Sequence, residues 1–174
     1  LTKDLAIGLL TSQTDAEKIK VQHGIARTEL VHGHQMVEVP SVGDRPPRQF
    51  TRRDIAEILE PRVEEMFDLV KREIVRAGYE GMLGAGVVIT GGTSLLEGMP
   101  DAAERGLNLP ARRGMPTGIG GLRDIVSNPM HATGVGLLLH ARQHADNLEA
   151  AGIRHGKGLG KVFDRMRSWM FEFF

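Results

Sequence analysis

The pattern of hydrophobic and polar positions in the first fifty residues predicts two helices followed by a small sheet. Residues 1–10 (LTKDLAIGLL) are spaced like the second half of a helix. Thr14 is the expected N-cap of a second, short helix, because Glu17 three residues later completes a capping box. Residues 21–50 form short, alternating segments broken by glycine and proline, a pattern that favours a small antiparallel sheet.

A long helix is expected next. Apolar side chains recur at three- and four-residue spacing from Ile55 to Ile74, which is typical of a helix with one buried face. Thr51 can cap its start, and Gly78 ends it. Pro61 lies inside the pattern, so the helix either kinks there or restarts with Pro61 in its first turn.

The following segment predicts a buried strand and a glycine turn. Residues 84–90 (GAGVVIT) are a short apolar run rich in β-branched side chains. Gly91 and Gly92 then turn the chain, and a short helix begins at Ser94. A glycine pair after a strand lets the backbone approach a flat ring or a phosphate, although ordinary turn geometry is the simpler explanation. No lysine follows at the spacing of a Walker loop.

The next fifty residues predict a loop, a helix and a linker. Residues 110–121 are rich in Gly and Pro, and residues 130–142 (MHATGVGLLLHAR) have helical spacing. Residues 143–158 are polar and contain three glycines, a composition suited to a flexible linker.

The last sixteen residues, 159–174, predict an amphipathic helix with an aromatic apolar face. Such a helix would be about 24 Å long, too short to cross a bilayer. Residues 157–174 hold four basic and two acidic side chains. We therefore expect the helix to lie on an anionic membrane surface; the alternatives are docking on the protein's own core or in a partner's groove. The expected membrane-binding residues are Leu159, Val162, Phe163, Met166, Trp169, Met170, Phe173 and Phe174.

Composition narrows the choice of function. Hydrophobic residues make up 41% and charged residues 25% of the chain, as in ordinary soluble domains. Lys plus Arg (22) equals Asp plus Glu (22), so the net charge indicates no nucleic-acid partner. The absence of Cys excludes disulfides, thiolate zinc sites and cysteine nucleophiles. His140 and His144 are one helical turn apart, but HARQH lacks the glutamate of the zinc-protease pattern, and no metal site is expected.

Several motifs together resemble one protein family. The segment GVVITGGTSLLEGM resembles the adenosine motif of the actin-like ATPases. The segments LTKDLAIGL, DAEKIKVQHG, VEVPSVGDRPPR, IAEILEPRVEE and GLRDIVSNPMHATGVGLL, with the amphipathic end, follow the order of the C-terminal part of the FtsA family. These are bacterial cell-division proteins, and the resemblance covers nearly the whole chain. Because the chain starts at Leu1, we expect it to be a segment of a longer protein.

The resemblance implies an α/β fold: the incomplete C-terminal lobe of an actin-like (RNase H-like) ATPase, with a C-terminal amphipathic helix. Residues 1–10 and 85–142 correspond to part of subdomain 2A, and residues 11–84 to subdomain 2B. Residues 143–158 correspond to a linker and residues 159–174 to a membrane-targeting helix.

The resemblance also implies a nucleotide site. Glu17 and Lys20 stand where the actin-like superfamily reaches the ribose and adenine, although alone they would be interpreted as a cap and a solvated charge. Gly91, Gly92, Thr93 and Ser94 match the adenosine loop. The phosphate-binding and magnesium-binding segments would precede Leu1, so no catalytic residue is assigned. ATP with magnesium is expected in the full-length parent, and no stably bound nucleotide is expected here.

The implied function is a membrane tether that links FtsZ filaments to the cytoplasmic face of the inner membrane at the division site and helps to recruit division proteins. Residues 11–84 would bind the acidic C-terminal peptide of FtsZ, and the parent would self-associate. The alternative for many of the basic side chains in this region is that they form ordinary ion pairs with acidic residues of the long helix. Another actin-like scaffold, such as a pilus-assembly relative, and an ATP-binding switch are the alternative functions. The candidate partner-binding residues are Arg48, Arg52, Arg53, Arg62, Arg72 and Arg76.

Overall fold

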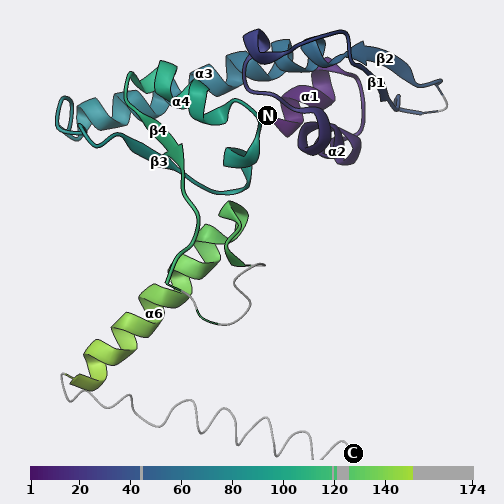
Figure 1. Ribbon diagram of the computed structural model, residues 1–174. Helices are drawn as coiled ribbons and strands as arrows, with labels where there is room; N and C mark the ends of the chain where they lie inside the picture. The colour runs from purple at the N-terminus through teal and green to yellow at the C-terminus, as the bar shows by residue number, and fades with distance from the viewer. Residues whose placement is uncertain (44, 119, 121–125, 151–174) are drawn as a thin grey trace, which may run out of the picture. The chain divides into compact units, whose positions relative to one another are not determined.

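The computed structural model describes residues 1–43, 45–118, 120 and 126–150. The chain divides into two compact units, Leu1–Ala132 and Thr133–Phe174. Figure 1 shows the helices and strands along the chain. In order they are α1 (Thr2–Gly8), α2 (Gln13–His23), the 3₁₀ turn η1 (Thr28–Leu30), β1 (Met36–Val39), β2 (Arg48–Thr51), α3 (Arg52–Arg76), β3 (Val87–Ile89), the 3₁₀ turn η2 (Gly92–Leu95), α4 (Met99–Leu107), β4 (Ala111–Arg113), the 3₁₀ turn η3 (Pro129–His131) and α6 (Ala132–Ala150).

The first two predicted helices are present, but the second begins earlier than the sequence suggests. Ser12, not Thr14, is the N-cap of α2. The Ser12 hydroxyl oxygen accepts a hydrogen bond from the amide of Asp15 at 3.1 Å and donates one to the Asp15 carboxylate at 2.7 Å. Thr14 is an exposed residue in the first turn. The Thr14 prediction was wrong because Ser12 and Asp15 make the cap two residues upstream.

The predicted small sheet is confirmed, although it is narrower than expected. β1 and β2 pair antiparallel, with Val37 opposite Phe50 and Val39 opposite Arg48. The side chains of β1 alternate, so that Val37 and Val39 are buried. Residues 21–23 instead complete α2, and Thr28–Leu30 form η1. At η1 the Glu60 carboxylate accepts hydrogen bonds from the Thr28 amide at 3.1 Å and from the Thr28 hydroxyl at 2.6 Å, which join this turn to α3.

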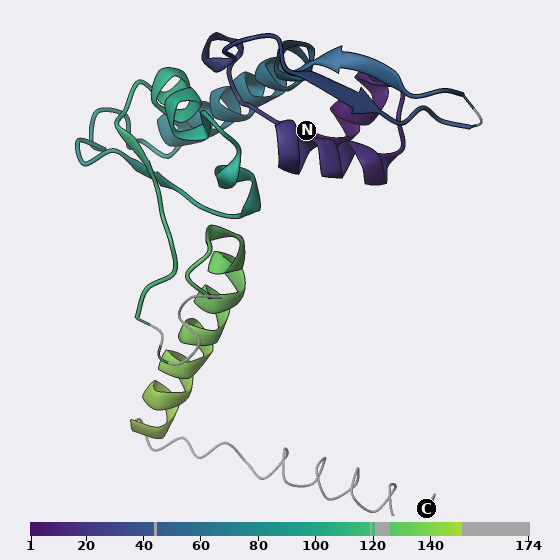
Figure 2. The same cartoon turned by 45° about the vertical axis from the view of Figure 1, so that its right-hand side comes forward.

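The predicted long helix is confirmed as α3, which runs through Pro61 without restarting. Thr51 and Asp54 form a full capping box: the Asp54 amide donates to the Thr51 hydroxyl at 3.1 Å, and the Thr51 amide donates to the Asp54 carboxylate at 2.7 Å. Pro61 is exposed, so its ring does not disturb the buried face. Figures 1 and 2 show α1 and α4 beside different parts of α3.

The core of the first unit lies between α1, α3, α4 and the β1–β2 pair. The fully buried residues include Leu5 of α1, Leu9 at its C-cap, and Ile55, Leu59 and Val63 of α3. Full burial of a side chain of this size stabilises the folded state by about 1.5–3 kcal/mol. These residues fix α1 against α3, and α2 packs against α1. The core therefore holds the two N-terminal helices in a defined relative position.

The predicted strand after residue 84 is present but only partly buried. β3 pairs in parallel with β4, so that Val87 lies opposite Ala111 and Ile89 opposite Arg113. The Val88 side chain remains 53% exposed. In the part of the chain that the structure describes, this sheet has two strands, and a two-stranded sheet leaves side chains uncovered.

The second unit contains most of α6, which is longer than the predicted helix over 130–142. Residues 143–150, predicted as part of a linker, continue α6. The rest of the predicted linker and the membrane-targeting helix over 159–174 lie outside the described residues. Among the helices that are described, none combines the length and the apolar character needed to cross a membrane.

Candidate nucleotide site

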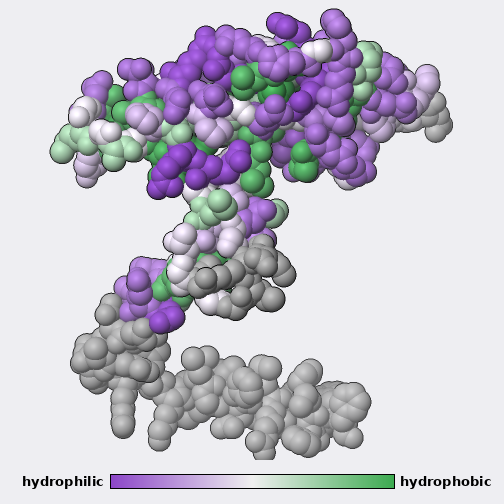
Figure 3. Space-filling view, viewed as in Figure 1, coloured by the Kyte–Doolittle hydropathy of each residue, from purple (hydrophilic) through white to green (hydrophobic). Residues whose placement is uncertain are grey.

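The first unit contains a cavity of about 550 Å³ at the junction of α2, the start of α3 and the turn after β3. On the face of the molecule that Figure 3 shows, hydrophilic residues predominate over the first unit and hydrophobic areas are smaller. Four of the six predicted nucleotide-binding residues, from segments far apart in the sequence, meet at this cavity. The lining residues are Glu17, Lys20, Val21, Gln22, Gly24, Arg52, Gly92, Thr93, Leu95, Leu96, Glu97 and Met130.

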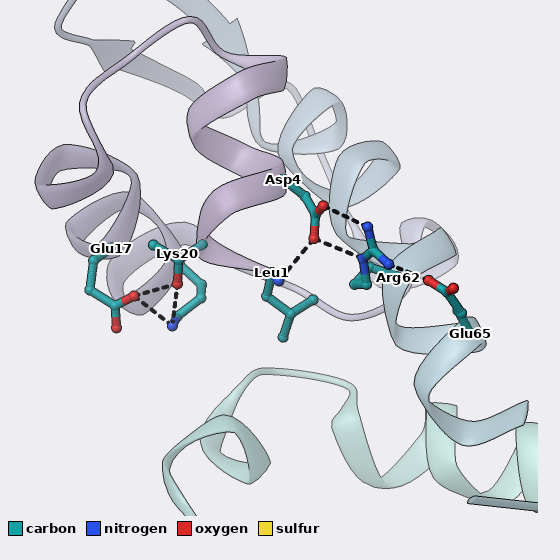
Figure 4. A network of polar contacts seen from close by, with 7 residues as sticks. Leu1, Asp4, Glu17, Lys20, Arg62 and Glu65 are labelled. Atoms are coloured by element: carbon teal, nitrogen blue, oxygen red, sulfur yellow. Dashed lines mark hydrogen bonds and ion pairs between the residues drawn. The ribbon is translucent and has the colours of Figure 1, made fainter. Parts of the chain in front are cut away.

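One wall of the cavity carries the paired side chains of Glu17 and Lys20. These residues are one turn apart on α2, and the Lys20 ammonium lies 2.7 Å from Oε2 of Glu17 (Figure 4). The Lys20 side chain is 17% exposed and that of Glu17 50% exposed. The hydrogen bond from Lys20, and then the one from Thr2, hold the pKa of Glu17 below its usual value. The pair therefore presents a carboxylate acceptor and an ammonium donor to a ligand.

The opposite wall is the glycine turn after β3. Gly91 has φ 89° and ψ 169°, a backbone conformation that residues with a side chain almost never adopt. Its amide donates a hydrogen bond to the Pro129 carbonyl at 3.1 Å. The Ser94 hydroxyl donates to the Gly91 carbonyl at 2.7 Å and is buried. Gly91 and Ser94 therefore shape the turn from behind, while Gly92 and Thr93 face the cavity.

Arg113 is a contributor that the sequence analysis missed. Its Nε donates to the Ser94 carbonyl at 2.7 Å, so that β4 supports the glycine turn from the neighbouring strand. Only the β3–β4 register places Arg113 there, opposite Ile89. No spacing in the sequence connects the two segments.

Arg52 lines the candidate nucleotide cavity, although the sequence analysis assigned it to partner binding. Its Nε donates to the His23 carbonyl at 3.1 Å, and its guanidinium forms an ion pair with Glu97. Its amide also bonds to the Gln35 carbonyl at 2.8 Å. Arg52 therefore joins the end of α2, the start of α3 and the segment after the glycine turn.

Three apolar side chains at the cavity remain exposed. Val21 is 74% exposed, Met130 56% and Leu95 42%. They come from α2, η3 and η2 respectively. Apolar surface next to a few polar groups is the usual composition of a small-molecule site, and it suits a flat heteroaromatic ring. The sequence analysis named none of the three.

The remaining partner candidates do not gather in one cluster. Arg62 pairs with Asp4 of α1 through two contacts of 2.9 Å and also contacts Glu65, while Arg53 pairs with Glu57 at 3.3 Å. The Arg62 guanidinium holds the pKa of Asp4 well below its usual range, with the Leu1 amino group at 2.9 Å as a second cause (Figure 4).

The other three candidates lie elsewhere. The Arg48 guanidinium contacts the Leu9 carbonyl and sits 5.1 Å above the Phe50 ring. Arg76 pairs with Glu73, and Arg72 is exposed. Two of these three guanidinium groups therefore already have partners within the protein.

The structure offers no metal site within its described residues, where no group of three or more His, Asp or Glu side chains could hold an ion. The His140 and His144 rings lie 4.9 Å apart on α6. The eight residues expected at the membrane, from Leu159 to Phe174, lie outside the described residues.

Sequence comparison finds similarity to one family. The family model described as Cell division protein FtsA matches residues 1–136. Cell division protein FtsA of Pseudomonas aeruginosa is 40% identical over 98% of this chain and 42% of its own length. The Escherichia coli K12 protein of the same description is 39% identical with the same coverage, and that of Rhizobium meliloti is 36% identical over the whole chain and 40% of its own length. The chain thus spans about two fifths of the curated relatives it matches.

Structural comparison finds a related fold. MreB5 of Spiroplasma citri bound to ADP superposes with a TM-score of 0.62 at 15% identity, over 85% of this chain and 45% of MreB5. The same protein bound to AMPPNP gives a TM-score of 0.62 over 86% of this chain. At this identity the likeness concerns the fold, which is a partial actin-like α/β domain.

Proposed function

The chain belongs to the FtsA family of cell-division proteins, and from this premise we propose that it is the adenosine-binding and partner-binding part of a membrane tether in the bacterial division ring. The tether links FtsZ filaments to the cytoplasmic face of the inner membrane. The observation that carries the adenosine-binding part is the cavity where Glu17 and Lys20 of α2 meet Gly92 and Thr93 of the glycine turn. The partner and membrane parts rest on the family to which the chain belongs.

The cavity suits the adenosine part of a nucleotide. A carboxylate accepts hydrogen bonds from sugar hydroxyls, and exposed apolar side chains offer a surface to a flat base. Gly92 lets the backbone approach the ligand because it has no side chain. In this proposal the phosphates and magnesium are held by another part of the longer protein, and this chain carries out no catalysis alone.

Nucleotide binding is tested by titrating adenosine into the ¹⁵N-labelled chain. We expect weak, saturable shifts of the Gly92 and Thr93 amide signals, which Glu17→Gln should weaken. Glu57→Gln on the exposed face of α3 is the control and should leave the titration unchanged. Shifts spread evenly over the chain, or equal binding by Glu17→Gln, contradict the proposed site.

The partner surface is proposed on residues 11–84, with Arg48, Arg53, Arg62, Arg72 and Arg76 as candidate contacts to an acidic FtsZ tail peptide. Arg72 is the sharpest test because it is exposed, whereas Arg62 is engaged with Asp4. We expect Arg72→Glu to weaken peptide binding in a fluorescence anisotropy assay at low salt. Equal affinity for the Arg72→Glu and wild-type chains would remove Arg72 from the contact surface.

Arg52 provides the matched comparison for this assay. Its guanidinium is engaged at the nucleotide cavity, so Arg52→Gln should impair adenosine binding more than peptide binding. If Arg52→Gln impaired peptide binding more than adenosine binding, Arg52 would belong to the partner surface.

The membrane link is proposed through residues 159–174. In co-sedimentation with anionic vesicles, the intact chain should pellet with the lipid, whereas a chain that ends at Gly158 should stay in the supernatant. Added salt should lower the pelleted fraction of the intact chain. Trp169 is the only tryptophan, so its emission should shift to the blue on vesicle binding. Equal sedimentation of both chains contradicts the proposed anchor.

A further inference from the structure

Thr2 connects the two charged residues of the nucleotide cavity although it does not line the cavity itself. Its hydroxyl donates to Oε2 of Glu17 at 2.5 Å, and the same oxygen accepts a hydrogen bond from the Lys20 ammonium at 3.0 Å. Lys20 also donates to Oε2 of Glu17 at 2.7 Å. The three polar groups therefore form a closed triangle between α1 and α2.

This triangle makes the two oxygens of the Glu17 carboxylate unequal. Oε2 receives both the Thr2 hydroxyl and the Lys20 ammonium. In the part of the chain that the structure describes, no protein group bonds to Oε1, and the side chain is half exposed at the cavity. Oε1 is therefore the acceptor that is available to a ligand hydroxyl.

Thr2 is well suited to hold this arrangement. A β-branched side chain in a helix has few χ1 rotamers, so its hydroxyl position is restricted. α1 is fixed by fully buried Leu5 and Leu9, which pack in the core of the first unit. A rigid donor on a fixed helix lowers the entropy that Glu17 loses when it binds a ligand.

We propose that Thr2 is a positioning residue that orients Glu17 toward the vicinal hydroxyls of a ribose and so makes the cavity selective for ribonucleosides over 2′,3′-dideoxynucleosides. This proposal rests on the proposed nucleotide function and adds the sugar selectivity and the residue that sets it. Thr2 acts through Glu17 and does not contact the ligand.

The test compares adenosine and 2′,3′-dideoxyadenosine in amide-shift titrations of the full chain. We expect Thr2→Val, which keeps the side-chain shape and removes the hydroxyl, to weaken adenosine binding about fivefold, which corresponds to the loss of one hydrogen bond. Its affinity for dideoxyadenosine should stay unchanged, and Thr2→Ser should restore selectivity for adenosine.

Thr28 supplies a matched control. Its hydroxyl donates to the Glu60 carboxylate at 2.6 Å, and neither residue lines the nucleotide cavity. Thr28→Val therefore removes the same kind of bond elsewhere in the first unit. It should leave the ratio of the two affinities at the wild-type value.

A second readout needs no ligand. Because the Lys20 and Thr2 hydrogen bonds lower the pKa of Glu17, Thr2→Val should raise that pKa toward its usual value in a ¹³C-detected carboxyl titration. If Thr2 served only to hold α1 against α2, Thr2→Val would weaken the binding of adenosine and of dideoxyadenosine equally.

The outcomes separate the two proposals. Absence of saturable adenosine binding to the wild-type chain overturns the proposed nucleotide site, and the role of Thr2 with it. Wild-type binding with an unchanged affinity ratio in Thr2→Val overturns the positioning role alone. An unchanged Glu17 pKa in that variant also overturns it.

Discussion

Gly91 and Gly92 are neighbours in the turn after β3, yet the backbone makes different demands on them. Gly91 lies at φ 89° and ψ 169°, a region that residues with a side chain almost never occupy. Gly92 begins η2 with an ordinary φ, and a side chain there would meet the Met130 Cβ at 3.9 Å, a normal contact. Two identical residues therefore have separate positions in the structure: Gly91 sets the backbone of the turn, and Gly92 lines the cavity.

These roles predict different effects of the same substitution. Gly91→Ala should destabilise the folded chain by about 1–3 kcal/mol because the backbone is strained with a Cβ atom at this position. Gly92→Ala should change stability by no more than about 0.5 kcal/mol. Urea unfolding at pH 7 measures both, and equal losses in the two variants would contradict the assignment.

At the scale of single elements, the start of α2 shows how neighbouring polar residues compete to cap a helix. Ser12 and Asp15 bond to each other and satisfy the first turn, and Thr14 has become a helical residue. Lys18 adds an ion pair with Asp15 at 2.9 Å. Because Glu17 is not used by a cap, its carboxylate is available at the candidate nucleotide cavity.

Substitutions at the two candidate caps distinguish them. Ser12→Ala should destabilise the chain by about 1 kcal/mol, since it removes the N-cap acceptor. Thr14→Ala should be neutral or slightly stabilising, because alanine is the better helix former at an exposed position. Thermal unfolding of both variants provides the measurement, and a larger loss in Thr14→Ala would reverse the assignment of the cap.

The interior proline of α3 gives a second prediction at this scale. Pro61 has no amide hydrogen, so the helix lacks one backbone hydrogen bond on its exposed side. Pro61→Ala should stabilise the chain by about 1–3 kcal/mol. Leu59→Ala, at a fully buried position of the same helix, should destabilise it by about 2–5 kcal/mol. A loss of stability in Pro61→Ala would indicate that the surrounding structure requires the proline.

At the scale of the first unit, the Asp4–Arg62 pair joins α1 to α3 across 58 positions of sequence. The pKa of the Asp4 carboxyl is lower in the folded chain than in the unfolded one. The pair therefore contributes stability at pH values above the unfolded pKa of about 4. This contribution decreases as the pH falls through that value toward the folded pKa.

A pH series checks this linkage. Asp4→Asn should be less stable than the wild-type chain at pH 7, and the difference between the two should narrow as the pH falls below about 4. Urea unfolding at a series of pH values supplies the measurement. Asp101→Asn, which changes an exposed carboxylate on α4, is the control. A difference in unfolding free energy between the wild-type and Asp4→Asn chains that is constant with pH would contradict the role of Asp4.

Local patterns in the sequence determined a large part of this molecule. Helical spacing and the Thr51 cap predicted α3, and alternation predicted the β1–β2 pair, because hydrogen bonds and burial within a short segment leave their period in the sequence. Ordered motifs identified the FtsA family and predicted which residues would form a nucleotide site. The elements depend on residues within one segment and on its own periodicity, and the family on the order of such segments along the chain.

Only the tertiary structure decided which of these residues meet. It brought Arg52 to the candidate nucleotide cavity, Arg113 behind the glycine turn and Thr2 against Glu17. Each contact joins elements that are distant in sequence, and its geometry follows from the packing of α1 and α3 and from the β3–β4 register. The spacing of apolar and polar residues indicates which face of its own element a side chain occupies. It does not indicate which other element packs against that face.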